Sequence, residues 1–253
     1  MPLVVTHKDD PNETRWYASL FDFSRHRGLA VLADPALDEI ERKIGHPDLI
    51  FSFYYRSMLP MSVLKRARLG AFNMHGSLLP KFRGRAPLNW AILKGETETG
   101  ATLHEMVEKP DAGRIVDQQA VPIGPDETAV EVFNKMTEAA EQVLKRNIQN
   151  LTKGTAVLKP QNLSAGSYYG RRRPEDGRID WSKSALEIHN LVRAVAPPFP
   201  GAFSGSMKIN KSKLEEKKKP PPGILGPYQD NGEWFAGCGD GKVLRLLEVL
   251  PEK

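Results

Sequence analysis

The sequence predicts an α/β protein whose first domain holds a Rossmann-like, mostly parallel sheet and whose C-terminal domain is a small, OB-like β-barrel. Strand-like and helix-like segments alternate through the first 150 residues, which is the pattern of a parallel sheet with crossover helices. Short β-like pieces gather after residue 200, as in a small barrel or an open β-domain. A chain of 253 residues with 40% hydrophobic side chains is long enough to build both cores.

In the first domain, each short apolar run is followed by a helical pattern. Strands are expected at residues 3–6, 29–32, 48–53 and 71–74, and helices at 16–26, 36–44, 60–67 and 87–94. Pro87 suits the first turn of the last of these helices. Two further strands, at 101–107 and 114–122, precede a long helix at about 127–149, and Gly154 marks the end of the domain.

The second part of the chain has a different pattern. The predicted division is an α/β domain at residues 1–154, a linker with a helix at 155–200 and a β-barrel at 201–253. Ser184 is a plausible N-cap for the linker helix, which should extend to Val195. Short strands are expected at 202–204, 207–209, 223–225, 234–236 and 243–250.

Composition indicates an ordinary globular protein of a reducing compartment. Cys238 is the single cysteine, so no intrachain disulfide can form. No apolar run reaches the roughly 20 residues of a membrane span, and the first residues lack a signal-peptide pattern. We therefore expect a soluble, cytoplasmic protein without membrane contact. No group of His, Cys, Asp and Glu has metal-ligand spacing, so no bound metal is expected.

The net charge of +5 is unevenly distributed. Residues 1–150 carry 19 basic and 20 acidic side chains, whereas residues 151–253 carry 17 and 11. Much of the basic excess lies in Arg171–Arg173 and in the lysine run Lys217–Lys219. Such an excess can bind an anionic ligand, for example a nucleotide sugar or RNA, or can belong to a solvated loop. For the lysine run, which precedes Pro220–Gly223, the solvated loop is the favoured interpretation.

The segment Asn73–Gly84 has the features of a reaction centre. Residues two apart in a strand project from the same face, so Asn73 and His75 can reach one reacting group. An amide can donate a hydrogen bond there, and an imidazole can accept a proton. In isolation, an Asn or His at a strand end is more often an ordinary turn residue, and Asp111 before Ala112–Gly113 is also typical of a turn.

Several motifs together resemble the formyltransferases that use 10-formyltetrahydrofolate. They are His75–Trp90, Gly95–Gly100, Asp111–Gly113, Phe51–Arg56, Val192–Val195, Pro200–Ser204 and Cys238–Gly241. Within that family the resemblance is strongest to the transformylase domains that formylate UDP-4-amino-4-deoxy-L-arabinose. It implies a formyltransferase catalytic domain at 1–154, a nucleotide-sugar substrate and 10-formyltetrahydrofolate as formyl donor. It also implies a role in lipid A modification, lipopolysaccharide biosynthesis and antibiotic resistance.

The resemblance implies roles for individual residues. Asn73 would stabilise the oxyanion, His75 would shuttle the proton, and Asp111 would orient the imidazole and favour its protonated form. The residues implied for cofactor binding are Ser57, Met58, Leu59, Arg85, Val107, Glu108, Lys109, Pro110 and Asp111. The other histidines, including His7, His104 and His189, are assigned structural roles.

Arginines are the predicted contacts of the sugar nucleotide. Arg83, Arg171 and Arg172 carry guanidinium groups that can form forked hydrogen bonds with phosphates. The alternative for Arg83 and Arg85 is that they are surface cations.

The chain departs from the family at its N-terminus. Family members begin with a strand and a glycine-containing turn, whereas this sequence starts at what corresponds to their second strand, so about thirty residues are missing from the match. In a doubly wound sheet the first strand is usually central, and its loss exposes apolar edges. A folate-binding protein without activity is therefore one alternative function.

A methionyl-tRNA formyltransferase is the other alternative. Such enzymes are expected to carry a basic loop after the strand that here ends at Thr6, yet this chain has the acidic segment Asp9–Thr14. Arg85 and His75–Ser77 also stand where the tRNA enzymes usually show alanine. These differences favour a sugar nucleotide over nucleic acid, although Lys217–Lys219 would suit RNA. A homo-oligomer is compatible with the sequence.

Overall fold

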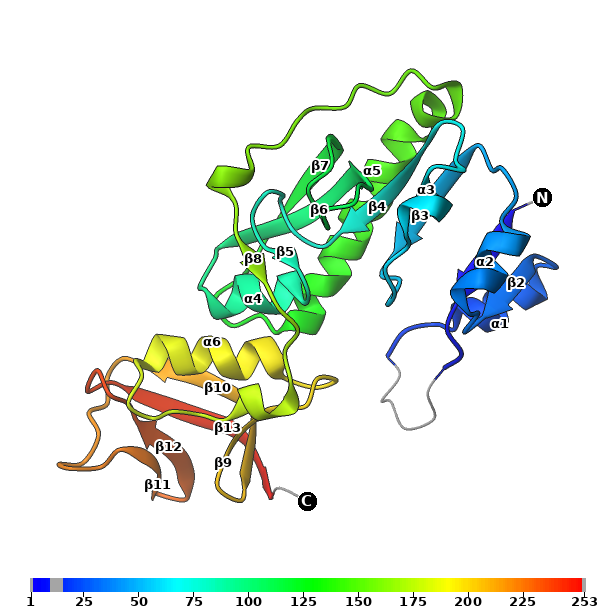
Figure 1. Cartoon of the computed structure of the whole chain (residues 1–253). Coiled ribbons are helices and arrows are strands. Elements are labelled where there is room, and N and C mark those ends of the chain that lie inside the picture. Colours follow the sequence, from blue (N-terminus) through cyan, green and yellow to red (C-terminus); the bar gives the residue numbers. More distant parts are fainter. Residues whose placement is uncertain (1, 10–15, 252–253) are drawn as a thin grey trace.

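The computed structural model describes residues 2–9 and 16–251. The first domain is built on a four-stranded sheet in the order β3–β4–β6–β7. Its strands are β3 (Leu49–Phe53), β4 (Gly70–His75), β6 (Glu98–Glu105) and β7 (Ile115–Pro122). The long helix α5 (Ala129–Lys153) lies along one face of β6 and β7 (Figure 1). It buries Val132, Met136 and Val143 in the same core as Leu103 of β6, which fixes the sheet against the helix.

The domain has the Rossmann-like α/β fold, with two kinds of strand pairing. β3 and β4 run parallel and are joined through the short helix α3 (Met61–Leu64). β6 is antiparallel to β4 and to β7. β6 and β7 are joined by a loop without a helix, so they form a hairpin-like pair. A parallel pair would need a crossover of a dozen or more residues. The loop of this pair carries Asp111.

The first elements of the chain form a separate unit beside β3 (Figure 1). β1 (Leu3–Thr6) pairs in parallel with β2 (Ala30–Ala33), and helices α1 (Leu20–His26) and α2 (Leu37–Lys43) accompany them. Among the described residues, β1 has no hydrogen-bonded neighbour other than β2, so the sheet is interrupted between β1 and β3. Val5 packs into the small apolar cluster around Ile50, and the ring of His7 stacks on Tyr55 at 5.0 Å.

The helix expected at 16–26 begins only at Leu20, because the Ser19 side chain caps it by accepting a hydrogen bond from the Asp22 N–H. Most of the acidic segment 9–14 lies outside the described residues.

The C-terminal domain is an antiparallel sheet covered by one helix. Its order is β11 (Gly226–Asp230), β12 (Glu233–Gly237), β13 (Val243–Pro251), β10 (Met207–Glu215) and β9 (Ala202–Ser204). β9 and β11 do not pair with each other in the described part of the chain, so the sheet is open rather than closed into a barrel. The strand expected at 223–225 starts only at Gly226, and it follows a turn at Pro222 and Gly223 in which Gly223 has φ +75°.

Helix α6 (Ala185–Val195) joins the two domains. A capping box between Ser184 and Glu187 starts it, as the sequence predicts for Ser184. The helix packs on β10 of the C-terminal sheet and on α4 (Pro87–Leu93) of the first domain (Figure 1). The buried guanidinium of Arg193 donates hydrogen bonds to the carbonyl oxygens of Gly124 and Glu127, which ties α6 to the start of α5.

The linker also returns to the first domain. After the 3₁₀ turn Leu163–Ala165, β8 (Tyr168–Tyr169) pairs in parallel with β5 (Arg83–Gly84), and a second 3₁₀ turn follows at Pro174–Gly177. The ring of Tyr169 stacks between Phe82 at 5.5 Å and Trp90 at 4.7 Å. In the described ranges, no helix is long and apolar enough to cross a membrane, and no three His, Cys, Asp or Glu side chains are grouped as a metal site.

Candidate active site

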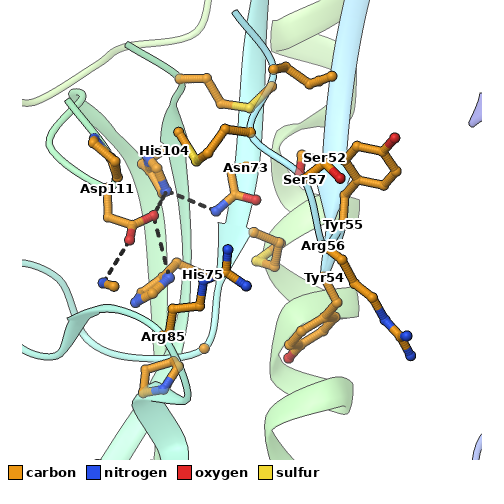
Figure 2. A pocket seen from close by; sticks show the side chains of 18 of the residues that line it. Ser52, Tyr54, Tyr55, Arg56, Ser57, Asn73, His75, Arg85, His104 and Asp111 are labelled. Carbon is orange, nitrogen blue, oxygen red and sulfur yellow. Dashed lines mark hydrogen bonds and ion pairs between the residues drawn. The ribbon is translucent and has the colours of Figure 1, made fainter. Parts of the chain in front are cut away.

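The reaction cavity, as we name it, has a volume of about 430 Å³ and opens at the C-terminal ends of β3 and β4. Its walls come from the segment after β3, from the end of β4, from β6 and from the β6–β7 loop (Figure 2). Asn73, His75 and Asp111 all line it. Ligands of α/β sheets bind at this end of parallel strands, so the position suits a substrate site.

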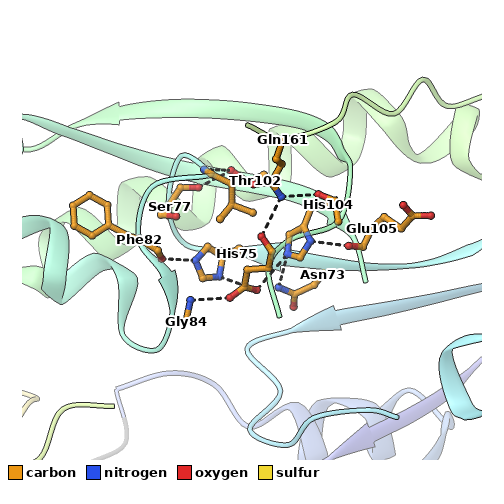
Figure 3. A network of polar contacts seen from close by, with 12 residues as sticks. Asn73, His75, Ser77, Phe82, Gly84, Thr102, His104, Glu105 and Gln161 are labelled. Atoms are coloured by element: carbon orange, nitrogen blue, oxygen red, sulfur yellow. Dashed lines mark hydrogen bonds and ion pairs between the residues drawn. The ribbon is translucent and has the colours of Figure 1, made fainter. Parts of the chain in front are cut away.

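Asn73 and His75 lie two residues apart on β4, as the sequence predicts, and each faces a different partner. The Nδ2 of Asn73 is 3.1 Å from Nε2 of His104. His75 is buried, and its Nε2 lies 2.8 Å from the backbone oxygen of Phe82. Its Nδ1 lies 3.5 Å from Oδ1 of Asp111 (Figure 3). The strand therefore presents an amide and an imidazole to one cavity, and Asp111 reaches the imidazole from the neighbouring loop.

The Asp111 loop is held close to β6 by a glycine. A Cβ at Gly113 would lie 1.9 Å from the carbonyl oxygen of Glu105, so only glycine allows this approach of the two backbones. Gln161 of the linker donates from Nε2 to the carbonyl oxygens of Asp111 and Gly113, at 3.1 and 2.6 Å. The backbone N–H of Gly84 donates to Oδ2 of Asp111 at 2.8 Å. These contacts explain why the motif Asp-Ala-Gly places its carboxylate here.

The carboxyl of Asp111 is charged. Burial by itself raises its pKa, but the neighbouring imidazoles of His104 and His75 and the N–H of Gly84 outweigh burial, and the pKa lies below its usual value. Its Oδ1 is 3.5 Å from both His75 Nδ1 and His104 Nε2, so the two rings share one oxygen. An anion fixed in this way can stabilise an imidazolium that forms during a reaction.

The imidazole of His75 is neutral at rest. Burial lowers its pKa, and the charge of Asp111 with the carbonyl of Phe82 compensates only in part. In the neutral ring Nε2–H donates to the Phe82 oxygen, so Nδ1 is the nitrogen that carries the lone pair. Nδ1 can therefore take a proton and, once protonated, donate to Asp111. Asp111 thus acts in the expected direction, because it raises the pKa of His75, but burial outweighs it and the net pKa lies below the usual value.

His104 is a cavity residue that the sequence analysis assigned to a structural role. Its Nδ1 lies 2.9 Å from the carbonyl oxygen of Glu105 and must donate to it, which leaves Nε2 to accept from the Asn73 amide. This contact fixes which end of Asn73 is the donor. The antiparallel register sets Asn73 directly opposite His104, and this register cannot be deduced from either segment alone.

Backbone strain is concentrated around the cavity. Tyr54, Ala86 and Asp111 line it with φ of +54°, +50° and +53°, a region that side-chain-bearing residues rarely adopt. Phe82, whose carbonyl oxygen binds His75, has φ +56°. Such clustering is typical of functional sites, where the surrounding structure holds strained residues in place.

Most residues expected to bind the cofactor line the reaction cavity. They are Ser57, Met58, Leu59, Arg85, Val107, Pro110 and Asp111. Glu108 and Lys109 do not line it, because their side chains turn outward to solvent in the loop before Asp111. The cavity also includes Tyr54, Tyr55 and Tyr168, which the sequence analysis did not single out as binding residues. Tyr54 and Tyr55 lie in the motif Phe51–Arg56, and this motif was the available signal for them.

The predicted phosphate-binding arginines are separated. Arg83 is buried and lines neither of the cavities described here, and its Nε and Nη1 have no hydrogen-bond partner among the described residues. Arg171 and Arg172 line a second cavity of about 300 Å³, which we name the arginine cavity. It is bounded by Arg171–Arg173, Asn89 and Phe199 and lies between the linker and α4. Ala86 lines both cavities.

Sequence comparison identifies the family. Residues 3–148 match the formyl transferase family, and residues 172–253 match the formyl transferase C-terminal domain. The chain belongs to the formyl transferase family. The protein is accordingly a formyltransferase, and the match spans both the sheet that carries Asn73 and His75 and the domain after the linker.

Several solved structures, two of which are named as formyltransferases, have a similar architecture. WlaRD, a sugar 3N-formyl transferase determined with dTDP and 5-N-formyl-THF, is 26% identical, with a TM-score of 0.77 over 96% of this chain and 86% of WlaRD. An N-formyltransferase from Helicobacter canadensis, in complex with folinic acid and dTDP-3-aminofucose, is 23% identical, with a TM-score of 0.76 over 96% of this chain and 98% of that one. HypX from Aquifex aeolicus, with tetrahydrofolic acid, is 23% identical, with a TM-score of 0.67 over 98% of this chain and 46% of HypX.

Proposed function

We propose that this formyltransferase transfers the formyl group of 10-formyltetrahydrofolate to the amine of a nucleotide-linked amino sugar. The observation that carries the proposal is that Asn73, His75 and Asp111 line one cavity of a formyl transferase domain, with Nδ1 of His75 3.5 Å from Oδ1 of Asp111 and Asn73 hydrogen-bonded to His104. The same types of group are needed for attack of an amine on a formyl carbon. WlaRD, a sugar 3N-formyl transferase, was solved with dTDP and a formylated folate, which supports both the donor and the acceptor.

The reaction cavity fits a folate donor. Its volume of about 430 Å³ lies in the range of small-molecule sites. Met58, Leu59 and Met106 give it an apolar wall, while Ser57 and the backbone at Val107 offer polar atoms for a pterin edge. When bound there, the folate supplies the formyl group that is transferred. Arg85, which lies beside His75 among the lining side chains in Figure 2, provides a positive charge there.

The three polar residues divide the chemistry between them. As an amine attacks the formyl carbon, the carbonyl oxygen becomes negative, and the Asn73 N–H that does not bind His104 can donate to it. The attacking nitrogen must lose a proton, and Nδ1 of His75 is the base that can take it. The imidazolium that results is stabilised by Asp111 at 3.5 Å and by the Phe82 carbonyl at 2.8 Å. As the carbonyl re-forms, the bond between the formyl carbon and N10 of the folate would break, and the His75 imidazolium would return its proton to N10, so no covalent enzyme intermediate is needed.

The acceptor that we propose is a UDP-linked 4-amino sugar, UDP-4-amino-4-deoxy-L-arabinose in particular. Support for it comes from the motif resemblance between His75 and Trp90, and sugar nucleotides as a class are supported by the solved sugar formyltransferases. The lysine run offers less support for tRNA, because Lys218 is paired with Asp230 and lies over the ring of Phe235. Roles in lipid A modification and antibiotic resistance would follow from that acceptor.

A panel of acceptors tests the proposal. The protein is incubated with 10-formyltetrahydrofolate and UDP-4-amino-4-deoxy-L-arabinose, other UDP- and dTDP-amino sugars, or methionyl-tRNA, and N-formyl products are measured by mass spectrometry. We expect turnover of amino sugars, fastest with the UDP-linked 4-amino sugar. Efficient formylation of tRNA with no sugar product would refute the proposal. Folate binding without any turnover would favour the inactive folate-binding alternative.

A further inference from the structure

The carbonyl oxygen of Phe82 decides which nitrogen of His75 carries the proton. It lies 2.8 Å from Nε2, whereas Oδ1 of Asp111 lies 3.5 Å from Nδ1, so each nitrogen faces an acceptor (Figure 3). A neutral imidazole has one proton and can donate to only one of them. The carboxylate is the stronger acceptor, so the proton stays on Nε2 only while the carbonyl remains at hydrogen-bond distance. A proton on Nδ1 would prevent this nitrogen from acting as a base.

The backbone at Phe82 needs support to keep this carbonyl in place. Phe82 has φ +56°, in the left-handed region that residues with a side chain rarely adopt. Such a conformation persists only where the surrounding structure holds it. Rotation of the backbone toward an ordinary conformation would turn the carbonyl away from His75. Hydrogen bonds to the two peptide groups that flank Phe82 are the contacts that prevent this rotation.

Ser167 of the linker makes a hydrogen bond with each of these two peptide groups. Its Oγ accepts from the N–H of Phe82 at 2.9 Å, which fixes the peptide group before Phe82. Its backbone carbonyl oxygen accepts from the N–H of Arg83 at 3.0 Å. The N–H of Arg83 and the carbonyl of Phe82 belong to one planar trans peptide group and point in opposite directions. Ser167 therefore holds one side of a peptide group whose other side contacts His75.

The linker fits closely against this loop on both sides of Ser167. The N–H of Ser167 donates to the carbonyl oxygen of Pro80 at 3.2 Å, and a Cβ at Gly166 would lie 2.3 Å from the same oxygen. On the other side, the ring of Tyr169 stacks on the ring of Phe82 with 5.5 Å between their centres. Phe82 is only 6% exposed, so bulk water cannot readily replace the contacts that Ser167 makes.

We propose that Ser167 is a positioning residue for formyl transfer. By holding both peptide groups beside Phe82, it keeps the Phe82 carbonyl on Nε2 of His75 and leaves Nδ1 free to accept the amine proton. The proposal rests on the proposed function, because it takes Nδ1 of His75 as the base. It gives the linker a part in the reaction, since a segment between the two domains sets the tautomer of a residue on β4.

Nitrogen-15 NMR of the full chain labelled at histidine measures the tautomer of His75 without any substrate. The spectra are recorded at about pH 8, where imidazoles are neutral, and the His75 signals are assigned by their loss in His75→Gln. We expect the wild type to carry the proton on Nε2. Ser167→Ala removes the Oγ acceptor of the Phe82 N–H and should shift neutral His75 toward the Nδ1–H tautomer. Ser167→Thr keeps a hydroxyl and should restore the wild-type signals.

Kinetics with an active amino-sugar substrate separate positioning from binding. In Ser167→Ala, kcat should fall in proportion to the Nε2–H fraction that remains, by about three- to tenfold. KM for both substrates should stay within about twofold, because Ser167 lines neither cavity. Ser164→Ala is the matched control, since the Oγ of Ser164 donates to Oδ1 of Asn162 on an exposed part of the same linker. It should leave the His75 signals and kcat unchanged, and thermal unfolding checks that each variant is folded.

Two results would overturn the assignment. One is a wild-type protein whose neutral His75 carries its proton on Nδ1, a test that needs no variant at Ser167. The other is a folded Ser167→Ala variant with the His75 signals or the kcat of the wild type. If Ser167→Ala does not fold, Ser167→Cys takes its place, because a thiol is a weaker acceptor than a hydroxyl. Failure of the proposed function has a different signature: the tautomers would follow the expected pattern, yet no nucleotide amino sugar would be formylated.

Discussion

Replacing Gly113 with alanine perturbs the proposed active site without touching a chemical group. The new Cβ would lie 1.9 Å from the carbonyl oxygen of Glu105, whereas ordinary contact begins at 3.4 Å, so one backbone must move by about 1.5 Å. The moving parts are the loop that carries Asp111 and the carbonyl that binds His104. Gly113 does not have a positive φ, so the effect is steric and not conformational.

The size of the effect follows from this displacement. A misplacement of about 1 Å of positioned catalytic groups can reduce the rate by about 10²-fold, which corresponds to about 2.7 kcal/mol in activation free energy. Overpacking of a tight site typically costs about 1–3 kcal/mol of folding stability. We therefore expect Gly113→Ala to fold with a lower Tm and to lose about 10²-fold in kcat, because Asp111 no longer meets His75 at the distance seen here.

Gly170→Ala is the matched control. A Cβ at Gly170 meets no atom within 4 Å, its φ is not positive, and its carbonyl can still accept from Trp90. Its stability should change by less than about 0.5 kcal/mol and its kcat should be unchanged. Formyl transfer is followed by the mass of the product, and stability by thermal unfolding. A Gly113→Ala enzyme with kcat within threefold of the wild type would refute the claim that this loop positions Asp111.

Two further predictions concern the histidines. His104→Leu removes the acceptor of the Asn73 amide, so kcat should fall by about tenfold, with KM for the folate little changed. This loss is smaller than the roughly 10²–10³-fold cost of losing an oxyanion donor, because Asn73 itself remains. Unchanged kcat in steady-state kinetics would count against this positioning role. The pKa of His75 is lowered by burial, so the unfolded chain binds more protons below about pH 6.5. Unfolding free energy should therefore be fully retained above that pH and should fall below it, by up to about 1.4 kcal/mol per pH unit for this group. Denaturation between pH 8 and 5 measures it, and an equally steep decline in His75→Gln would contradict it.

The core of the candidate site could be predicted because its signals are local. Asn73 and His75 are two apart in a short apolar strand, and this period alone places them on one face. Asp111 was different, since its own surroundings suggest an ordinary turn and only the family pattern singled it out. Its approach to His75 depends on the β6–β7 loop folding back on Glu105, which Gly113 permits.

What could not be predicted depends on contacts between distant segments. His104 meets Asn73 through the antiparallel register of β4 and β6, and no local periodicity encodes that pairing. The separation of β1 and β2 from the main sheet is also a property of tertiary pairing. The arginine triplet was visible as charge, but its cavity arises from the pairing of β8 with β5 and the packing of Phe199. Charge alone could not distinguish this arrangement from a solvated loop.

The most direct test of the central claim is single-turnover formyl transfer from 10-formyltetrahydrofolate to UDP-4-amino-4-deoxy-L-arabinose, measured for the wild type and for His75→Ala in parallel. The account predicts an N-formylated sugar nucleotide from the wild type. It predicts at least a 10²-fold slower reaction from a variant that folds and binds folate normally. Equal rates for the two proteins would contradict the role of His75, and no transfer to any nucleotide amino sugar would contradict the proposed function itself.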